Sequence, residues 1–533
     1  MHYAIIFVLL LSFIFGLGLL ARRLAIPYPI LFVMGGLFIG FIPDLPTLRL
    51  DPDFIFFIFL PPLLYIQAFY TSWRDFRREL RPIALLAIGL VFVTTVTVAY
   101  AAHWMIPDFP LAAGFVLGAI ISPPDAIAAS AIAQRLGLPR RVVTIIEGES
   151  LVNDSTSLVI FRVALAAVGM NGGLSFIGRA WLPGEFLAVS AGGIAVGLAV
   201  GWLLRHVRQS IMNEGSQIAL TVSLLTPFVS YLAGEVTHVS SVLAVVSTGL
   251  YLGWEAPGFL TSAVRLQAQA VWEIIVYLLN GFVFVLIGLQ LPGILGGMQE
   301  HWWARPFFYA VVINLVCILV RIVWVFTGAY LLRLIKHIRQ NEPRPDPRHI
   351  FIISWCGMRG VVSLAAALVL NAYPDFPRGH LVQFIAFSVI LTTLVLQGLT
   401  LPFFIRLLGV DDDGTAAREE RAARTRMLEA VLGKIAEERR EEKYPTPALD
   451  NLEQIYRERT RALQDDLAGQ LGWSDRLYYQ LSLWRLQRVM ILAQRDVLLA
   501  LRREGIIGDD VLHKIERELD IEDVQLKAET GKI

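Results

Sequence analysis

About thirteen apolar stretches, each long enough to cross ~30 Å of hydrocarbon as a helix, follow one another through the first 408 residues. They lie at residues 3–20, 25–42, 54–70, 82–105, 111–133, 142–167, 184–204, 216–234, 238–254, 268–292, 306–332, 349–372 and 381–408. The composition agrees, since 56% of the 533 residues are hydrophobic and only 17% are charged. The sequence therefore predicts an all-α polytopic membrane protein with 13 transmembrane helices.

The basic residues of the connecting loops indicate how the chain is oriented. Loops after odd-numbered stretches carry seventeen Lys and Arg residues, and the opposite loops carry four. Because basic loops remain in the cytoplasm, we expect the N-terminus outside and the C-terminal tail inside a cell membrane that the chain crosses many times. The first stretch lacks the basic start of a signal peptide and is expected to remain as a helix.

The C-terminal segment has a different composition. Of the 45 acidic and 46 basic residues, 26 and 21 respectively follow position 410, among many helix-forming residues. We predict a transmembrane domain at 1–408 and a helical cytoplasmic regulatory tail at 409–533. The tail has no nucleotide or nucleic-acid signature. An apolar stripe within residues 477–508 favours a small bundle core or a dimer contact.

Two prolines interrupt the fifth apolar stretch. Pro123 and Pro124 directly precede Asp125, and each proline removes a backbone donor and clashes with the preceding helical turn. A membrane helix broken at this depth exposes free carbonyl and amide groups, which transporters use to bind ions. The sequence therefore predicts a broken helix with an ion site beside Asp125; a simple proline kink is the alternative.

The segment EGESLVNDSTSLVIF, residues 147–161, places several carboxylates inside the sixth apolar stretch. At 100° per residue, Glu147, Ser150 and Asp154 share one helical face, and Glu149 and Asn153 occupy a neighbouring face. Ionisable groups within a membrane normally face a bundle interior, a partner or a water-filled path. A carboxylate, a hydroxyl and carbonyls from the broken helix would suit a monovalent cation such as Na⁺, with Asp154 at the centre.

Glu149 needs a positive partner if it is to stay ionised while buried. We expect that partner to be Arg359, which lies in the twelfth stretch between Gly357 and Gly360. Three further charges within the apolar stretches are expected to form internal ion pairs: Arg162, Glu273 and Arg321.

Six segments together carry a family resemblance. They are ESLVND (149–154), LAIPYPILFVMGGLFIG, FLPPLL, SPPDAIAAS, LLNGFVFVLIGLQL and GMRGVVSLAAAL. The combination resembles bacterial electroneutral sodium/proton antiporters of the sodium/hydrogen exchanger family, within the monovalent cation:proton antiporter superfamily. The likeness covers residues 1 to about 408. It implies two inverted six-helix repeats, with broken fifth and twelfth helices that cross at mid-membrane, and a core domain that moves against a dimerisation domain.

The resemblance also implies roles for individual residues. Asp154 would exchange ions and protons, Ser150 and the backbone of Pro124 would help to coordinate the ion, and Asp125 would help to hold the site. Asn153 would stand where electrogenic relatives carry a second aspartate.

The same resemblance makes Glu149 and Arg359 a structural ion pair. This chain departs from the pattern in having Ile66 and Gln67 where some members carry an acid, and proline rather than threonine at position 124. Glu147 lies on the Asp154 face and could compensate.

The function implied is exchange of a monovalent cation (Na⁺, or Li⁺ or K⁺) for H⁺ by alternating access, electroneutral at 1:1, in pH and cation homeostasis. We expect a lipid-embedded homodimer with no cofactor, no catalytic residues and no nucleic-acid partner. A K⁺/H⁺ antiporter of the same fold is the nearest alternative. A cation channel would need a continuous polar pore, and an intramembrane hydrolase would have to use Asp125 and Asp154 as a pair. The cysteines, Cys317 and Cys356, have no disulfide or zinc spacing and are expected to pack in the core.

Overall fold

The computed structural model describes residues 2–24, 26–42, 52–169, 183–211, 216–259, 262–296, 304–331, 345–441 and 444–468, with residue 333 and scattered positions between 490 and 523. These described residues form helices and the turns between them, and none lies in a β-strand, as the sequence predicts. The chain divides into two compact units, Met1–Asp413, here called the membrane unit, and Gly414–Ile533, the tail unit.

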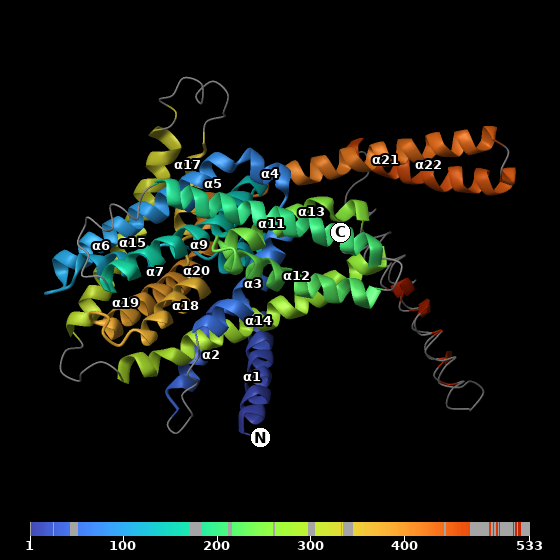
Figure 1. The fold of residues 1–533 in the computed structure, drawn as a ribbon. Helices are drawn as coiled ribbons and strands as arrows, with labels where there is room; N and C mark the ends of the chain where they lie inside the picture. Colours follow the sequence, from blue (N-terminus) through green and yellow to red (C-terminus); the bar gives the residue numbers. More distant parts are fainter. Residues whose placement is uncertain are drawn as a thin grey trace. The chain divides into compact units, whose positions relative to one another are not determined.

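The membrane unit is built entirely from helices in its described part (Figure 1). They are α1 (His2–Leu24), α2 (Tyr28–Gly40), α3 (Pro52–Tyr70), α4 (Trp73–Arg78), α5 (Leu80–Ala84), the π-helix η1 (Leu85–Leu90), α6 (Val91–Met105), α7 (Leu111–Ile121), α8 (Ala126–Leu136), α9 (Arg140–Gly169), α11 (Pro183–Ile211), α12 (Ser216–Val236), α13 (Ser241–Phe259), α14 (Ser262–Gly296), α15 (Ala304–Leu331), α17 (Pro347–Trp355), α18 (Val361–Val369), the 3₁₀ turn η3 (Leu370–Ala372), α19 (Gly379–Thr392), the π-helix η4 (Thr393–Gln397) and α20 (Gly398–Leu408).

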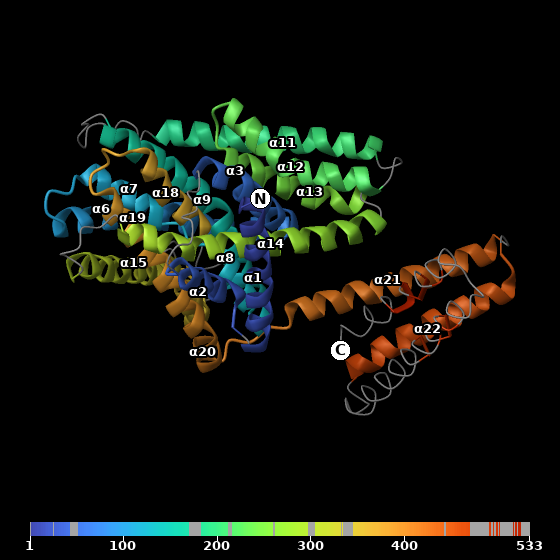
Figure 2. The same cartoon turned by 90° about the horizontal axis from the view of Figure 1, so that it is seen from below.

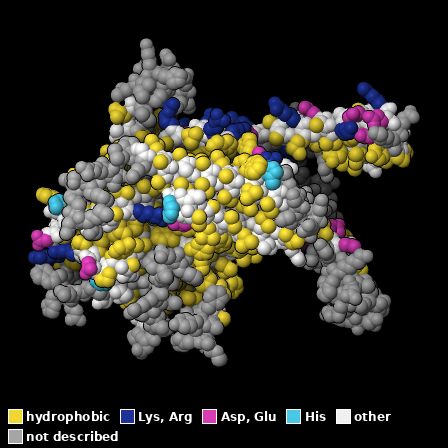
Figure 3. All heavy atoms as spheres, in the orientation of Figure 1, with side chains coloured by type: hydrophobic (Ala, Val, Ile, Leu, Met, Phe, Trp, Pro, Cys, Tyr) yellow, Lys and Arg dark blue, Asp and Glu magenta, His cyan; other side chains and the backbone are white. Residues whose placement is uncertain are grey.

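Seven helical stretches of the described chain are individually long and apolar enough to cross a membrane. They are Leu80–Met105, Arg140–Val168, Leu187–Val207, Gln217–Val236, Val264–Gly296, Ala304–Leu331 and Gly379–Leu408. Shorter apolar helices accompany them, including the halves α7 and α18. Hydrophobic side chains dominate the visible face of the membrane unit, as a lipid-facing surface requires (Figure 3). The count of thirteen spans and the inverted repeats stay predictions.

Two membrane helices are interrupted in the middle. The first consists of α7 and α8, separated by the non-helical residues 122–125, so the predicted break before Asp125 is confirmed. The second consists of α17 and α18, separated by residues 356–360. Each interruption leaves one helix C-terminus and one helix N-terminus inside the protein, where their backbone groups need partners.

Close backbone contacts hold the remaining helices together. Helices α2 and α14 meet at Gly36 and Gly288, where an added Cβ would lie 2.1 Å from the Val285 oxygen and 2.3 Å from the Val33 oxygen respectively. Only glycine permits this approach. Helices α11, α12 and α13 lie side by side at one edge of the membrane unit (Figure 2), and α3 packs against α13. Helix α9 packs instead against α7, α8 and η1.

The tail unit begins with a pair of antiparallel helices, α21 (Thr415–Arg440) and α22 (Thr446–Ala468), that pack together (Figure 1). Arg439 near the end of α21 contacts both Asp450 and Glu453 of α22 at 2.7 Å. These ion pairs favour this arrangement of the two helices, but because they are exposed they contribute little to stability.

A buried ion pair joins α9 to α15 inside the membrane unit. Arg321 of α15 donates to both carboxylate oxygens of Glu149, Nη1 to Oε1 at 2.6 Å and Nη2 to Oε2 at 2.8 Å, and both side chains are only 1% exposed. Arg321 also donates to the backbone oxygens of Ile353, Ser354 and Cys356 at the end of α17. All the polar atoms of the pair are thereby satisfied, which is the condition for keeping two charges buried.

The predicted partnership of Glu149 with Arg359 is therefore wrong. Glu149 bonds to Arg321, while Arg359 donates to backbone carbonyls instead of a carboxylate. The prediction that Arg321 forms an internal ion pair is confirmed.

We predict that Glu149→Ala and Arg321→Ala each lower the free energy of unfolding by about 3–5 kcal/mol, because each leaves a buried charge without its partner. The double variant should lose less than the sum of the two single losses. Unfolding by sodium dodecyl sulfate in mixed micelles, followed by circular dichroism, measures all three. The control is the same cycle with Glu149 and Arg359, which share no hydrogen bond. A larger coupling energy in the control cycle would contradict the observed pairing.

Candidate ion-binding site

The two interrupted helices contact each other at their breaks. The Asp125 amide donates to the Met358 carbonyl at 2.7 Å. The Asp125 carboxylate accepts from the Ile127 amide at the start of α8, at 2.8 Å, and its Oδ2 lies against Gly360, the residue before α18. Gly360 makes this possible, since a Cβ there would lie 1.8 Å from Asp125 Oδ2. One carboxylate thus caps the positive N-terminal end of α8 and lies beside the positive N-terminal end of α18.

Arg359 lies at the other two helix ends of the breaks, the C-terminal ends of α7 and α17. Its side chain is 1% exposed and donates to the Ile121 carbonyl at the end of α7, at 3.0 Å, and to the Gly357 carbonyl just past the end of α17. Its own amide donates to Thr393 Oγ1 at 3.1 Å. The guanidinium therefore lies where the negative C-terminal ends of α7 and α17 meet. Negative and positive helix ends each have a side chain of opposite charge.

Asp154 lies on α9 beside this crossing, in a small internal cavity. The cavity has a volume of about 30 Å³, and its polar lining consists of Gln67, Asp125, Ser150, Asp154 and Ser363. Asp154 is 6% exposed, and within the described chain its carboxylate receives no hydrogen bond or ion pair. The volume is close to that occupied by one water molecule in the liquid. A buried carboxylate facing such a space can accommodate one small cation or one proton.

Ser150 and Asn153 tie α9 to the break in the first helix. Ser150 Oγ accepts from the Ala126 amide at 3.2 Å, and Asn153 Nδ2 donates to the Pro124 carbonyl at 2.8 Å. Of the expected ion ligands, Asp154, Ser150 and Asp125 line the same cavity. Pro124 does not line it, because its carbonyl turns toward Asn153, and Pro123 lines the cavity in its place.

The other predicted supporting residues lie outside the cavity lining. Glu149 faces Arg321, and Glu147 is half-buried on α9 without lining the cavity. Two lining residues were missed as ligands from sequence, Gln67 and Ser363. Gln67 is a polar residue within an apolar helix, which is a usable signal. The Ser363 hydroxyl, buried and without a hydrogen bond, follows the second break by three residues, and its position depends on the crossing.

The other two residues that we expected in internal ion pairs, Arg162 and Glu273, are exposed. Arg162 contacts Glu235 at 3.2 Å, but the two side chains are 69% and 40% exposed, so this pair is not internal. Glu273 is exposed and accepts a hydrogen bond from Gln269 one turn earlier on α14. Cys317 and Cys356 are buried and unpaired, as expected for packing residues.

Sequence comparison identifies relatives along most of the chain. Residues 9–407 match the family model described as sodium/hydrogen exchanger, transmembrane. An uncharacterized Na⁺/H⁺ exchanger of Mycobacterium tuberculosis is 35% identical over 518 residues, covering 95% of this chain and 93% of the relative. The sodium, potassium, lithium and rubidium/H⁺ antiporter of Bacillus subtilis is 34% identical over 392 residues, covering 71% of this chain and 57% of the relative.

Structural comparison points the same way for the fold. The sodium proton antiporter MjNhaP1 from Methanocaldococcus jannaschii, solved at pH 8, superposes with a TM-score of 0.55. The match covers 77% of this chain and 100% of that structure at 20% identity, a level that supports the fold alone. With the family model spanning residues 9–407 and close relatives covering nearly the whole chain, the protein belongs to the sodium/hydrogen exchanger family and is a multi-pass membrane antiporter.

Proposed function

We propose that the protein exchanges one monovalent cation for one proton at Asp154 by alternating access. The observation that carries this proposal is the buried Asp154 carboxylate, which faces a cavity of about 30 Å³ without a hydrogen bond from the described chain. A carboxylate that can hold either a cation or a proton, but not both, makes the two ions compete for the same group. Ser150, Asp125, Gln67 and Ser363 supply further oxygen atoms around the cation.

Na⁺ is the first candidate for the transported cation, with H⁺ as the counter-ion. A relative from Bacillus subtilis is named a sodium, potassium, lithium and rubidium/H⁺ antiporter, so Li⁺ and K⁺ belong in the same test. K⁺/H⁺ exchange on the same fold is the alternative. The physiological role we propose is pH and cation homeostasis in the cell membrane, by a homodimer with its N-terminus outside. We assign residues 409–533 a regulatory role in the cytoplasm.

A single titrating carboxylate supports electroneutral exchange. Glu149 is bound by Arg321 through two hydrogen bonds, so the guanidinium balances its charge. Asn153 cannot take up a proton near neutral pH, and its amide is engaged by the Pro124 carbonyl. Asp125 is held by backbone amides at the helix ends. With one proton exchanged for one monovalent cation, the site carries the same charge in both loaded states.

Contacts near the ends of α9 and α12 suggest how one side of the path is closed. Ser155, next to Asp154, is 2.6 Å from Ser240, which lies between α12 and α13. Two turns further along α9, Arg162 contacts Glu235, which also accepts from Ser241 at 2.7 Å. Because α9 packs with the broken helix and α12 packs with α13, these contacts bridge two groups of helices. By the proposed orientation they form the outer barrier, which must open when Asp154 faces outward.

For the exchange site, we predict that Asp154→Asn abolishes cation-dependent proton flux in proteoliposomes, because an amide neither exchanges a proton near neutral pH nor provides a negative charge. Flux is measured with an internal pH-sensitive dye after pulses of Na⁺, Li⁺ and K⁺. Asp375→Asn, in an exposed loop, is the matched control and should leave flux unchanged. Cation-driven proton flux through a folded Asp154→Asn protein would exclude this carboxylate as the exchange site.

For the stoichiometry, we predict that membrane voltage does no net work on the cycle. Each uncompensated charge would contribute ~2.3 kcal/mol per 100 mV. Proteoliposomes held at zero and at about −100 mV, where that contribution would be evident, should reach the same cation gradient for a fixed pH difference. The voltage is set with an ionophore for an ion that the protein does not transport. A voltage-dependent gradient would show that a second group, Asp125 or Glu147, also exchanges protons.

For the outer barrier, we predict that Arg162→Glu and Glu235→Arg each change the apparent affinity for outside cation severalfold, because like charges now meet across the closed contact. The combined exchange Arg162→Glu/Glu235→Arg should return the affinity to within about twofold of the parent, since an exposed pair contributes only ~1 kcal/mol. The control is the reversal Arg205→Glu, which disrupts the contact with Glu255 between α11 and α13, within one group of helices. Failure of the swapped pair to restore affinity would argue against a barrier at this contact.

A further inference from the structure

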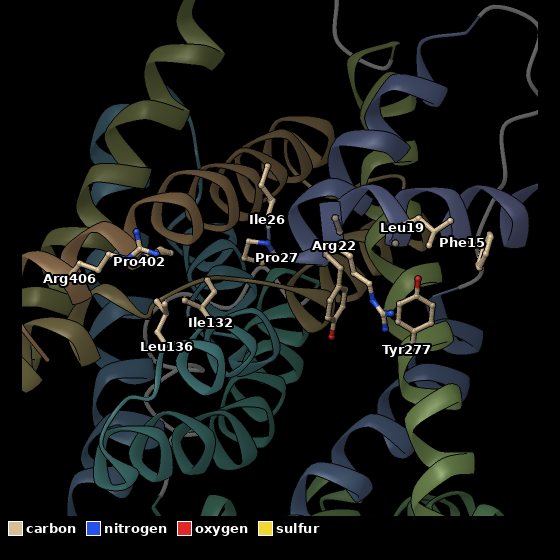
Figure 4. Close-up of a pocket in the computed structure, with 13 residues that line it drawn as sticks. Phe15, Leu19, Arg22, Ile26, Pro27, Ile132, Leu136, Tyr277, Pro402 and Arg406 are labelled. Atoms are coloured by element: carbon tan, nitrogen blue, oxygen red, sulfur yellow. The ribbon is translucent and has the colours of Figure 1, made fainter. Parts of the chain in front are cut away.

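A second cavity in the membrane unit has no lining residue in common with the ion cavity. Its volume is about 720 Å³, and it is bordered by α1, α2, α8, α14 and α20. Figure 4 shows Phe15, Leu19, Arg22 and Tyr277 on one side and Pro402 and Arg406 on the other. Asp154 is not part of its lining.

The cavity wall combines an apolar surface with two arginines. Its apolar part includes Phe15, Leu19, Ile132 and Leu136, and the charged groups are Arg22 and Arg406. Arg22 lies in the last turn of α1 and Arg406 in the last turn of α20. By the proposed orientation, both helix ends lie at the cytoplasmic surface of the bilayer.

Neither guanidinium is paired with a carboxylate of the described chain, although Arg22 lies beside the Tyr277 ring (Figure 4). Arg22 and Arg406 are exposed, and no described residue forms a hydrogen bond or an ion pair with either guanidinium. Elsewhere in the membrane unit, Arg321 and Arg359 are fully used by carboxylate and carbonyl oxygens. Two exposed arginines that border one apolar cavity are therefore available to bind an anion.

We propose that this cavity binds an anionic phospholipid. The phosphate of the headgroup is held by Arg22 and Arg406, and the acyl chains lie against the apolar wall between α1 and α8. Basic pockets between transmembrane helices on the cytoplasmic side suit anionic headgroups, because that leaflet is rich in anionic lipid. Two guanidinium groups beside apolar walls match both parts of such a lipid. A soluble phosphate would leave the apolar walls exposed to water.

A lipid bound in this cavity would lie between two groups of helices. Helices α1, α2 and α14 contact one another on one side, and α8 and α20 contact each other on the opposite side. Helix α8 is the half-helix capped by Asp125 beside the exchange site. A lipid in this cavity therefore connects the two groups of helices at the end of the broken helix.

The test measures lipid binding directly by native mass spectrometry of the full-length protein, in detergent titrated with phosphatidylglycerol or phosphatidylcholine. The parent should retain phosphatidylglycerol in preference to phosphatidylcholine. Arg22→Ala and Arg406→Ala should each weaken phosphatidylglycerol binding about fivefold, which is the contribution of one basic residue near an anionic lipid. Arg23→Ala is the matched control, because Arg23 is exposed beside Arg22 at the same helix end without lining the cavity.

A second pair of variants separates the cavity from surface charge. Leu19→Trp fills the cavity while leaving both arginines in place, and should also reduce phosphatidylglycerol binding. Leu20→Trp, at a neighbouring exposed position outside the lining, should not. Thermal unfolding of every variant checks that it is folded.

Four outcomes would overturn the proposal. Equal losses for Arg23→Ala and Arg22→Ala would indicate general surface attraction. Equal binding of phosphatidylcholine would remove the role of the charge, and full competition by glycerol phosphate would indicate a site for soluble anions. Loss of dimers in Arg22→Ala with unchanged lipid content would assign the cavity to a second copy of the chain. All readouts are independent of transport, so their failure leaves the antiporter proposal untouched.

Discussion

The contact between two broken helices is the constraint on which the rest of the membrane unit depends. Four helix ends meet inside the protein, and without water their free amides and carbonyls would each cost several kcal/mol. Asp125 caps the positive end of α8 and lies beside that of α18, and Arg359 donates to carbonyls at the two negative ends. Both charged side chains bond to backbone groups at these helix ends and so stabilise the crossing. Asp154 lies beside the crossing as a separate carboxylate.

Burying the charges of Glu149 and Arg321 is possible because each of the two has a complete set of partners. Arg321 binds Glu149 through two hydrogen bonds and also caps the carbonyls at the end of α17, so one guanidinium joins α9, α15 and the second broken helix. Such a pair contributes little net stability compared with an apolar contact, but it places α9 in one register. Asn153 and Ser150 then attach the same helix to the first break. Asp154 is thereby held at the crossing by neighbours on α9.

The proposed exchange site and the proposed lipid cavity are related through the broken helix. Asp125 begins α8 beside the ion cavity, and Leu136, the last residue of that helix, lines the larger cavity. A movement of α8 relative to α1 and α14 would change the shape of the larger cavity. The contacts of Ser155 and Arg162 with the α12–α13 region would have to change in the same movement. Alternating access would require the contacts on both sides of Asp154 to change together as one group of helices moves.

The helical membrane class, the break before Asp125 and the cluster of polar residues on α9 can all be predicted without any structure. These features depend on local chemistry: apolar length, the backbone effect of proline and the 100° helical repeat. Only the tertiary structure decided which arginine binds Glu149, because Arg321 and Arg359 both lie far away in the chain and their spacing from Glu149 carries no distance information. It also decided that the Pro124 carbonyl faces Asn153, that Ser363 borders the ion cavity, and that Arg22 and Arg406 share a second cavity. Each of these contacts joins helices distant in sequence, so it exists only after the helices have packed.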